Sequence, residues 1–165
     1  MKQDLYIIAA GKGSRMGGNL PKALVPISDD EPCLTTTLKQ IAHKFRNVFV
    51  VVNVDILDVW VDYLDGVKAH TSFEDEMPSF VRNVYLLPIK SGLGDGHAVM
   101  SALQDAQFKL IDYEKAPIFS NDIAICWGDV FFPHAELIDE LMSRRMTGAG
   151  LLPAVREDSP YVTLI

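Results

Sequence analysis

Short apolar runs alternate with segments of helical periodicity along the chain. The runs are four to six residues long and carry no charged side chain, which is typical of strands that are buried on both faces of a parallel sheet. The predicted strands are residues 5–10, 48–52, 84–87, 123–127 and 150–155.

Between these runs, apolar residues recur every three or four positions, which is the spacing of a helix with one buried face. The predicted helices carry these faces at residues 34–45, 56–63, 98–106 and 137–142. Strands that alternate with helices of this length form βαβ units with right-handed crossovers. The sequence therefore predicts an α/β fold with a mainly parallel sheet.

Length and composition indicate one domain that does not bind nucleic acid or a membrane. The 165 residues suit a single domain, residues 1–165, and the net charge of −7 would repel a phosphate polymer or an anionic membrane. Cys33 and Cys126 are far apart, which favours a reducing cytoplasm over a disulfide framework or a cysteine zinc site. The first apolar run is too short for a signal peptide or a membrane span, so we expect a cytoplasmic protein.

Glycines and positive charge gather directly after the first predicted strand. The chain reads Ala-Ala-Gly-Lys-Gly-Ser-Arg-Met from Ala9, and Pro21 and Lys22 follow after four further residues. Glycines in such a loop let backbone N–H groups point at an anion, and Arg and Lys side chains add donors for phosphate oxygens. The loop matches neither a Walker A sequence nor the dinucleotide fingerprint.

We therefore predict a triphosphate site here, and a glycine-rich turn with two solvated cations is the alternative. The predicted phosphate-binding residues are Ala10, Gly11, Gly13 and Ser14, and the predicted catalytic cations are Arg15 and Lys22.

Two later segments also place candidate chemistry after a predicted strand. Asp129 follows the run at residues 123–127, where a strand end presents a carboxylate to the ligand face of an open sheet. Mg²⁺ is usually held by one or two carboxylates together with substrate phosphates, so Asp129 is a candidate metal ligand; a turn residue or helix cap is the alternative. Gly94 and its neighbouring glycines lie between a strand and a helix, where the backbone can pass close to a flat base or form a plain turn.

Together these blocks resemble the sugar-1-phosphate nucleotidyltransferases, and most closely the domain that makes UDP-N-acetylglucosamine. The run Leu93-Gly94-Asp95-Gly96-His97-Ala98 is similar to the family's second glycine-rich loop, which lies beside the base and ribose. The run Trp127-Gly128-Asp129-Val130 resembles its metal-binding Gly-Asp pair. The resemblance implies a Rossmann-like three-layer α/β/α sandwich, nucleotide contacts at Gly94 and Asp95, and Mg²⁺ on Asp129.

The reaction that the resemblance implies is transfer of a nucleotidyl group from an NTP to a sugar 1-phosphate, with release of pyrophosphate. Asp95 stands where the family usually has Thr, and Ile89 stands where a uracil-reading Gln is expected. The identity of the nucleotide base therefore stays open. The family's sugar pocket and second metal ligand come from beyond the segment that resembles residues 151–165, so we expect either a truncated polypeptide or a reduced form of the fold. The alternatives are a non-catalytic nucleotide-binding module and transfer to another acceptor such as choline phosphate.

Overall fold

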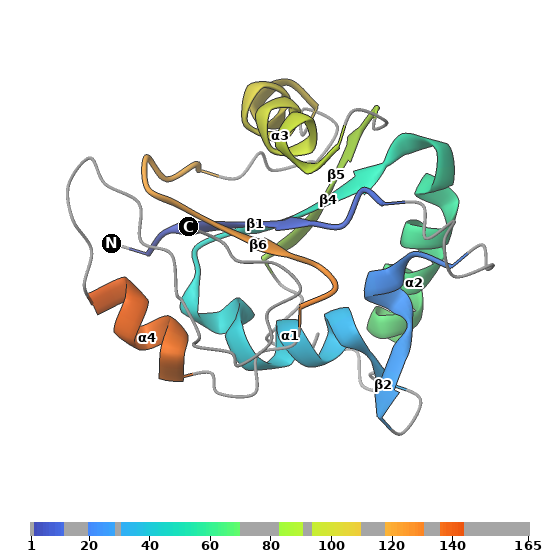
Figure 1. Ribbon diagram of the computed structural model, residues 1–165, viewed down its shortest axis with the longest axis horizontal. Coiled ribbons are helices and arrows are strands. Elements are labelled where there is room, and N and C mark those ends of the chain that lie inside the picture. The colour runs from blue at the N-terminus through green and yellow to red at the C-terminus, as the bar shows by residue number, and fades with distance from the viewer. Residues whose placement is uncertain are drawn as a thin grey trace, which may run out of the picture. The chain divides into compact units, whose positions relative to one another are not determined.

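A four-stranded parallel sheet with helices on both faces forms the larger of two compact units (Figure 1). The computed structural model describes residues 2–11, 20–28, 31–69, 83–90, 94–109, 118–130 and 136–143. The first unit, Met1–Phe132, contains β1 (Asp4–Ile8), β2 (Pro26–Ser28), β3 (Glu31–Pro32), α1 (Cys33–Ile41), β4 (Val48–Asn53), α2 (Leu57–Ala69), β5 (Val84–Ile89), α3 (Asp95–Lys109) and β6 (Ile123–Trp127). The second unit, Pro133–Ile165, contains α4 (Glu136–Ser143).

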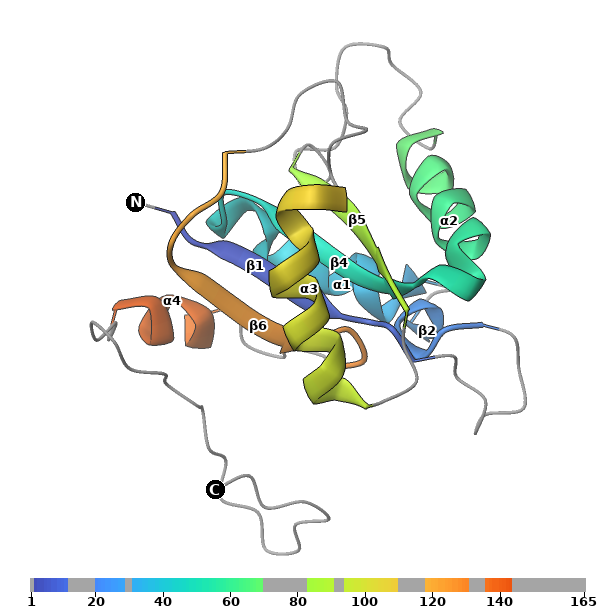
Figure 2. The ribbon, with the colours of Figure 1, turned by 90° about the horizontal axis from the view of Figure 1, so that it is seen from above.

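The strand order β5-β4-β1-β6 places the first strand inside the sheet. β1 pairs in parallel with β4 through Leu5 and Val48, and with β6 through Asp4 and Ile123. The chain runs outward from β1 through β4 to β5, and then returns to the other side of β1 as β6 (Figure 2). The strand order therefore reverses between β1 and β6, and ligands in open α/β sheets bind outside the carboxyl ends of the strands at such a point.

Each face of the sheet is covered by a helix, as the resemblance implied. α3 packs on one face, and its Ala98 and Ala102 lie in a buried cluster with Tyr6, Ile8, Ala10, Phe49, Val51, Leu87 and Ile89. α1 lies on the opposite side of the sheet (Figure 1) and buries Leu34, Leu38 and Ile41 completely. The predicted three-layer α/β/α arrangement with a parallel sheet is confirmed.

The predicted elements agree with the structure wherever it describes them. Four predicted strands correspond to β1, β4, β5 and β6, and the four predicted helices correspond to α1 to α4. The fifth predicted strand, residues 150–155, lies outside the described residues. The short antiparallel pair of β2 and β3 was not predicted, because Pro26 and Pro32 interrupt any strand pattern there.

β6 differs from the other strands of the sheet in its exposure. β1 and β4 are buried along their whole length, whereas Ile123, Ile125 and Trp127 of β6 are 37 to 39% exposed. These three residues pair in register with Asp4, Tyr6 and Ile8. β6 is thus an edge strand of the described sheet, and one row of its apolar side chains is partly exposed.

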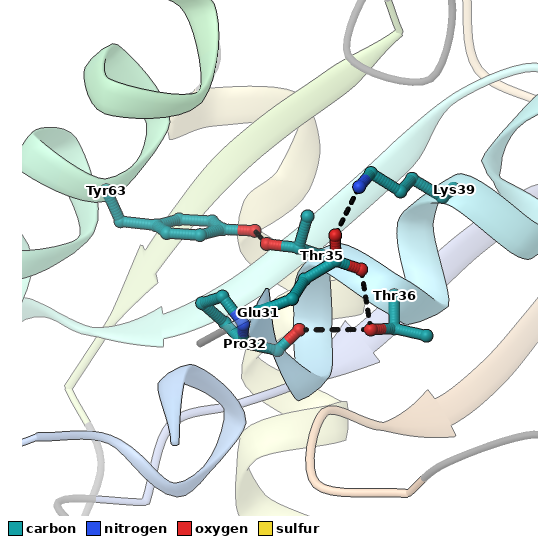
Figure 3. Close-up of polar contacts among 6 residues, drawn as sticks. All are labelled: Glu31, Pro32, Thr35, Thr36, Lys39 and Tyr63. Carbon is teal, nitrogen blue, oxygen red and sulfur yellow. Dashed lines mark hydrogen bonds and ion pairs between the residues drawn. The ribbon is translucent and has the colours of Figure 1, made fainter. Parts of the chain in front are cut away.

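Buried and half-buried polar contacts connect the elements. The Thr35 hydroxyl of α1 and the Tyr63 hydroxyl of α2 are 2.8 Å apart, and Glu31 accepts hydrogen bonds from Thr36 and Lys39 (Figure 3). At the amino end of the sheet, the buried Asp4 carboxylate accepts hydrogen bonds from the Asn47 amide at 2.9 Å and from the backbone N–H of Ser120 at 2.7 Å. These donors satisfy a charge that would otherwise be costly to bury.

We expect the free energy of unfolding to fall as the pH rises from about 9 to about 12. Burial raises the pKa of Cys126 from 9.0 to about 12, and it raises the pKa of both Tyr63 and Tyr6 from 10.0 to about 12, with Asp4 adding to the effect on Tyr6. In this window the unfolded chain has lost protons that the folded chain keeps, so each such group lowers stability by up to about 1.4 kcal/mol per pH unit.

Urea unfolding between pH 8 and pH 11 measures this dependence. The Tyr63→Phe variant lacks one of these groups, so its stability should decline less steeply, whatever its value at pH 8. A stability that stays constant up to pH 11 would contradict the assignment.

Candidate active site

Lys22 and Asp129 meet at the carboxyl edge of the sheet, next to the point where the strand order reverses. Lys22 begins the short 3₁₀ helix Lys22–Leu24, and Asp129 lies two residues after β6. The Lys22 Nζ atom is 3.7 Å from the Asp129 Oδ2 atom. The structure therefore brings together the predicted cation and the predicted metal ligand, which are more than a hundred positions apart in the sequence.

The neighbouring residues Ala23 and Gly128 explain this approach. A Cβ atom placed on Gly128 would lie 2.9 Å from the Cβ of Ala9 and 3.2 Å from the Cβ of Ala23. The Gly128 N–H donates to the Ile8 carbonyl at 2.9 Å, which continues the pairing of β1 and β6 beyond the strand ends. Only a glycine lets the turn after β6 lie this close to the end of β1 and to the 3₁₀ helix.

The ion pair itself is a weak contact. The side chains of Lys22 and Asp129 are 48 and 44% exposed, and ion pairs of this kind contribute about 1 kcal/mol or less. Each side chain can therefore leave the ion pair and bind a ligand instead, with little loss of free energy. An ammonium and a carboxylate side by side suit an anionic phosphate and its accompanying cation.

Helix α1 contacts the turn that carries Asp129. The Thr37 hydroxyl donates to the Val130 carbonyl at 3.4 Å. Burial raises the pKa of the Cys33 thiol, the negative charge of Asp129 raises it further, and a hydrogen bond with Thr37 lowers it. These α1 contacts could not be predicted from the sequence, because Cys33 and Thr37 occupy ordinary positions on the buried side of a helix.

The second glycine-rich segment lies at the same edge of the sheet. Gly94 has a φ of +91°, which L side chains rarely adopt, and its carbonyl accepts the Ala98 N–H at 3.2 Å in the first turn of α3. Asp95 is the first residue of α3. Ala98 and Ala10 belong to the same buried cluster, so the start of α3 lies near the carboxyl end of β1. The nucleotide-binding roles of Gly94 and Asp95 stay predictions.

The first glycine-rich loop is described only in part. Ala10 is buried and Gly11 is exposed. Gly13, Ser14 and Arg15 lie outside the described residues, so their roles stay predictions.

The donor set fits a Mg²⁺ ion that is shared with a substrate. Among the described residues, no three His, Cys, Asp or Glu side chains gather as they do around a protein-held metal. Asp129 offers one exposed carboxylate, and Mg²⁺ is commonly held by one carboxylate together with nucleotide phosphates and water. A metal at this edge would therefore depend on the nucleotide for most of its ligands.

Comparison with known proteins assigns the chain to a family. The profile of the MobA-like NTP transferase domain matches residues 5–164. The chain belongs to this family of nucleotidyltransferases. The match includes all four strands of the sheet, with β1 from Leu5, and the three segments that carry Lys22, Gly94 and Asp129.

Two curated relatives of this NTP transferase domain are bifunctional GlmU proteins. The protein from Ruegeria pomeroyi is 27% identical over 149 residues, which are 89% of this chain and 27% of the relative. The protein from Francisella tularensis subsp. novicida is 32% identical over 125 residues, which are 74% of this chain and 24% of the relative. The chain thus spans about a quarter of the length of these relatives.

A solved structure shares the fold of the NTP transferase domain. UDP-glucose pyrophosphorylase in complex with UDP-glucose aligns with a TM-score of 0.57 at 19% identity, over 87% of this chain and 54% of that one. At this identity the likeness concerns the fold alone.

Among the described residues, no helix has the length and apolar character needed to cross a bilayer.

We expect Gly128→Ala to lower the free energy of unfolding by about 1 to 3 kcal/mol, because the added methyl group would overlap Ala9. Gly66→Ala is a matched control within α2, where an added Cβ meets no atom of the described residues within 4 Å. This control should raise stability by up to about 1 kcal/mol, since alanine favours a helix over glycine. Urea unfolding of both variants measures the difference, and a Gly128→Ala variant as stable as the parent would refute the close contact.

Proposed function

We propose that the chain binds a nucleoside triphosphate at the carboxyl edge of its sheet and transfers the nucleotidyl group to a sugar 1-phosphate, with release of pyrophosphate. The observation that carries the proposal is the 3.7 Å approach of Lys22 to Asp129 at the point where the strand order reverses. Family membership supports the nucleotidyl transfer. The UDP-glucose held by the solved pyrophosphorylase supports a sugar phosphate as the acceptor.

The chain's own groups would act mainly by positioning and by neutralising charge. In the reaction, a phosphate oxygen of the acceptor forms a bond to the α-phosphorus of the NTP. The bond between the α-phosphorus and the oxygen bridging to the β-phosphate breaks, and that oxygen leaves with the pyrophosphate. The electrostatic stabilisation of the charge that develops is often the largest contribution to such catalysis.

Each predicted residue of the site would have a distinct role. Backbone N–H groups of Gly11, Gly13 and Ser14 would hold phosphate oxygens. Arg15 and Lys22 would balance charge on the α-phosphate and on the leaving pyrophosphate. The start of α3 at Gly94 and Asp95 would lie beside the base and ribose.

Asp129 is the residue that would hold Mg²⁺ with the nucleotide. The metal supplies charge neutralisation on phosphate oxygens when it is bound. Before substrate arrives, Asp129 and Lys22 neutralise each other, so the protein need not keep either charge unpaired.

We expect Lys22→Ala to lower the rate of pyrophosphate release by about 100- to 1,000-fold, the effect of losing one charge-stabilising donor. It should also weaken NTP binding about tenfold or more, since a hydrogen bond to a charged group contributes about 1.5 to 3 kcal/mol. Lys39→Ala is the control, because Lys39 also forms an ion pair but does so with Glu31, on the side of α1 shown in Figure 3. Calorimetric titration with ATP, CTP, GTP and UTP, and a pyrophosphate assay, give the two readouts.

The outcomes separate the proposed function from its alternatives. A Lys22→Ala variant that behaves like Lys39→Ala in both readouts would rule out the assigned role. NTP binding without release of pyrophosphate in the presence of any acceptor would favour a nucleotide-binding module. Release with choline phosphate in place of sugar 1-phosphates would keep the nucleotidyl transfer and change the acceptor.

A further inference from the structure

We infer that Thr37 is a positioning residue for Asp129, through its hydrogen bond to the carbonyl of the next residue, Val130. The inference rests on the proposed function, since it concerns the carboxylate that would share Mg²⁺ with the nucleotide. It assigns a role to a buried side chain in α1.

Asp129 depends on its neighbours for its position. Its side chain is 44% exposed, so packing does not fix it, and its contact with Lys22 is weak. On one side, the Gly128 N–H is bonded to Ile8 of β1 at 2.9 Å. On the other side, the Val130 carbonyl accepts the Thr37 hydroxyl at 3.4 Å, and Asp129 is held between these two anchors.

Thr37 is well placed to act as a rigid anchor. Its side chain is 1% exposed, and its helix neighbours Leu34 and Leu38 are completely buried in the core. A threonine in a helix often bonds to a carbonyl of its own preceding turn. Here the hydroxyl reaches a residue 93 positions later in the chain, so it links α1 to the end of β6.

The loss of this anchor has a specific consequence. Without it, the contacts of this turn that remain among the described residues are the Gly128 bond to Ile8, the weak Lys22–Asp129 ion pair, and the 3.4 Å bond from the Val130 N–H to the Trp127 carbonyl within the turn. The Asp129 carboxylate would then sample more positions before it meets the metal. Removal of a group that orients a metal ligand typically changes metal affinity by about 10- to 100-fold.

The test measures how much Mg²⁺ tightens NTP binding, and it needs no turnover. The tightest binder among ATP, CTP, GTP and UTP is titrated into the full 165-residue chain by calorimetry, with Mg²⁺ and with EDTA. Thr37→Val removes the hydroxyl at nearly constant volume, and Thr37→Ser keeps it. Thr35→Val is the matched control, because Thr35 lies two residues earlier in α1, is also buried, and bonds to Tyr63 instead (Figure 3).

We expect Thr37→Val to reduce the tightening by Mg²⁺ about tenfold while affinity in EDTA stays unchanged. Thr37→Ser and Thr35→Val should keep the tightening of the parent chain. A Thr37→Val variant with the full tightening would overturn the inference, and so would an equal loss in Thr35→Val, which would indicate a general loss of stability. Thr37→Ala replaces Thr37→Val if the valine variant does not fold.

The proposed function fails separately from this inference. If the parent chain binds no NTP, or binds it equally well with Mg²⁺ and with EDTA, the metal role of Asp129 is wrong. If the parent chain shows the tightening and Thr37→Val does too, only the positioning role of Thr37 is wrong.

Discussion

The close contact of Gly128 with Ala9 and Ala23 is the constraint on which the candidate site depends. Three segments from different parts of the chain meet there: the end of β1, the 3₁₀ helix that begins with Lys22, and the turn after β6. Each segment carries a small residue, and each of these small residues is adjacent to a predicted site residue in the sequence. The spacing of the charged groups at 3.7 Å follows from backbone packing beneath them, and the weak attraction between them would not be enough to impose it.

The candidate site would allow an acidic protein to bind an anion. The net charge of −7 makes long-range attraction of a triphosphate unfavourable, so binding must come from short-range donors. Backbone N–H groups do not change the net charge, and Lys22 is already beside a carboxylate. A cation that arrives with the nucleotide would offset part of the remaining repulsion.

The sheet and its helices could be predicted from the sequence, because buried strands and helix faces leave local patterns. The sequence also predicted that Lys22 and Asp129 serve one site, and the structure places them 3.7 Å apart. The runs at residues 48–52 and 123–127 correspond to strands within one residue at each end. The β2 and β3 pair could not be predicted, since its prolines hide it. Thr37 could not be predicted either, because its contact with Val130 depends on how two distant elements pack and leaves no periodicity. The roles of Gly13, Ser14 and Arg15 rest on the sequence alone.

The two tryptophans of the chain have opposite surroundings, and this gives the protein two optical probes. Trp60 in α2 is fully enclosed, whereas Trp127 at the end of β6 is 37% exposed and directly precedes the Gly128 contact. Iodide quenches the fluorescence of an indole only where it can collide with the ring. The quenchable part of the emission therefore reports on the carboxyl edge, and the protected part reports on the integrity of the interior.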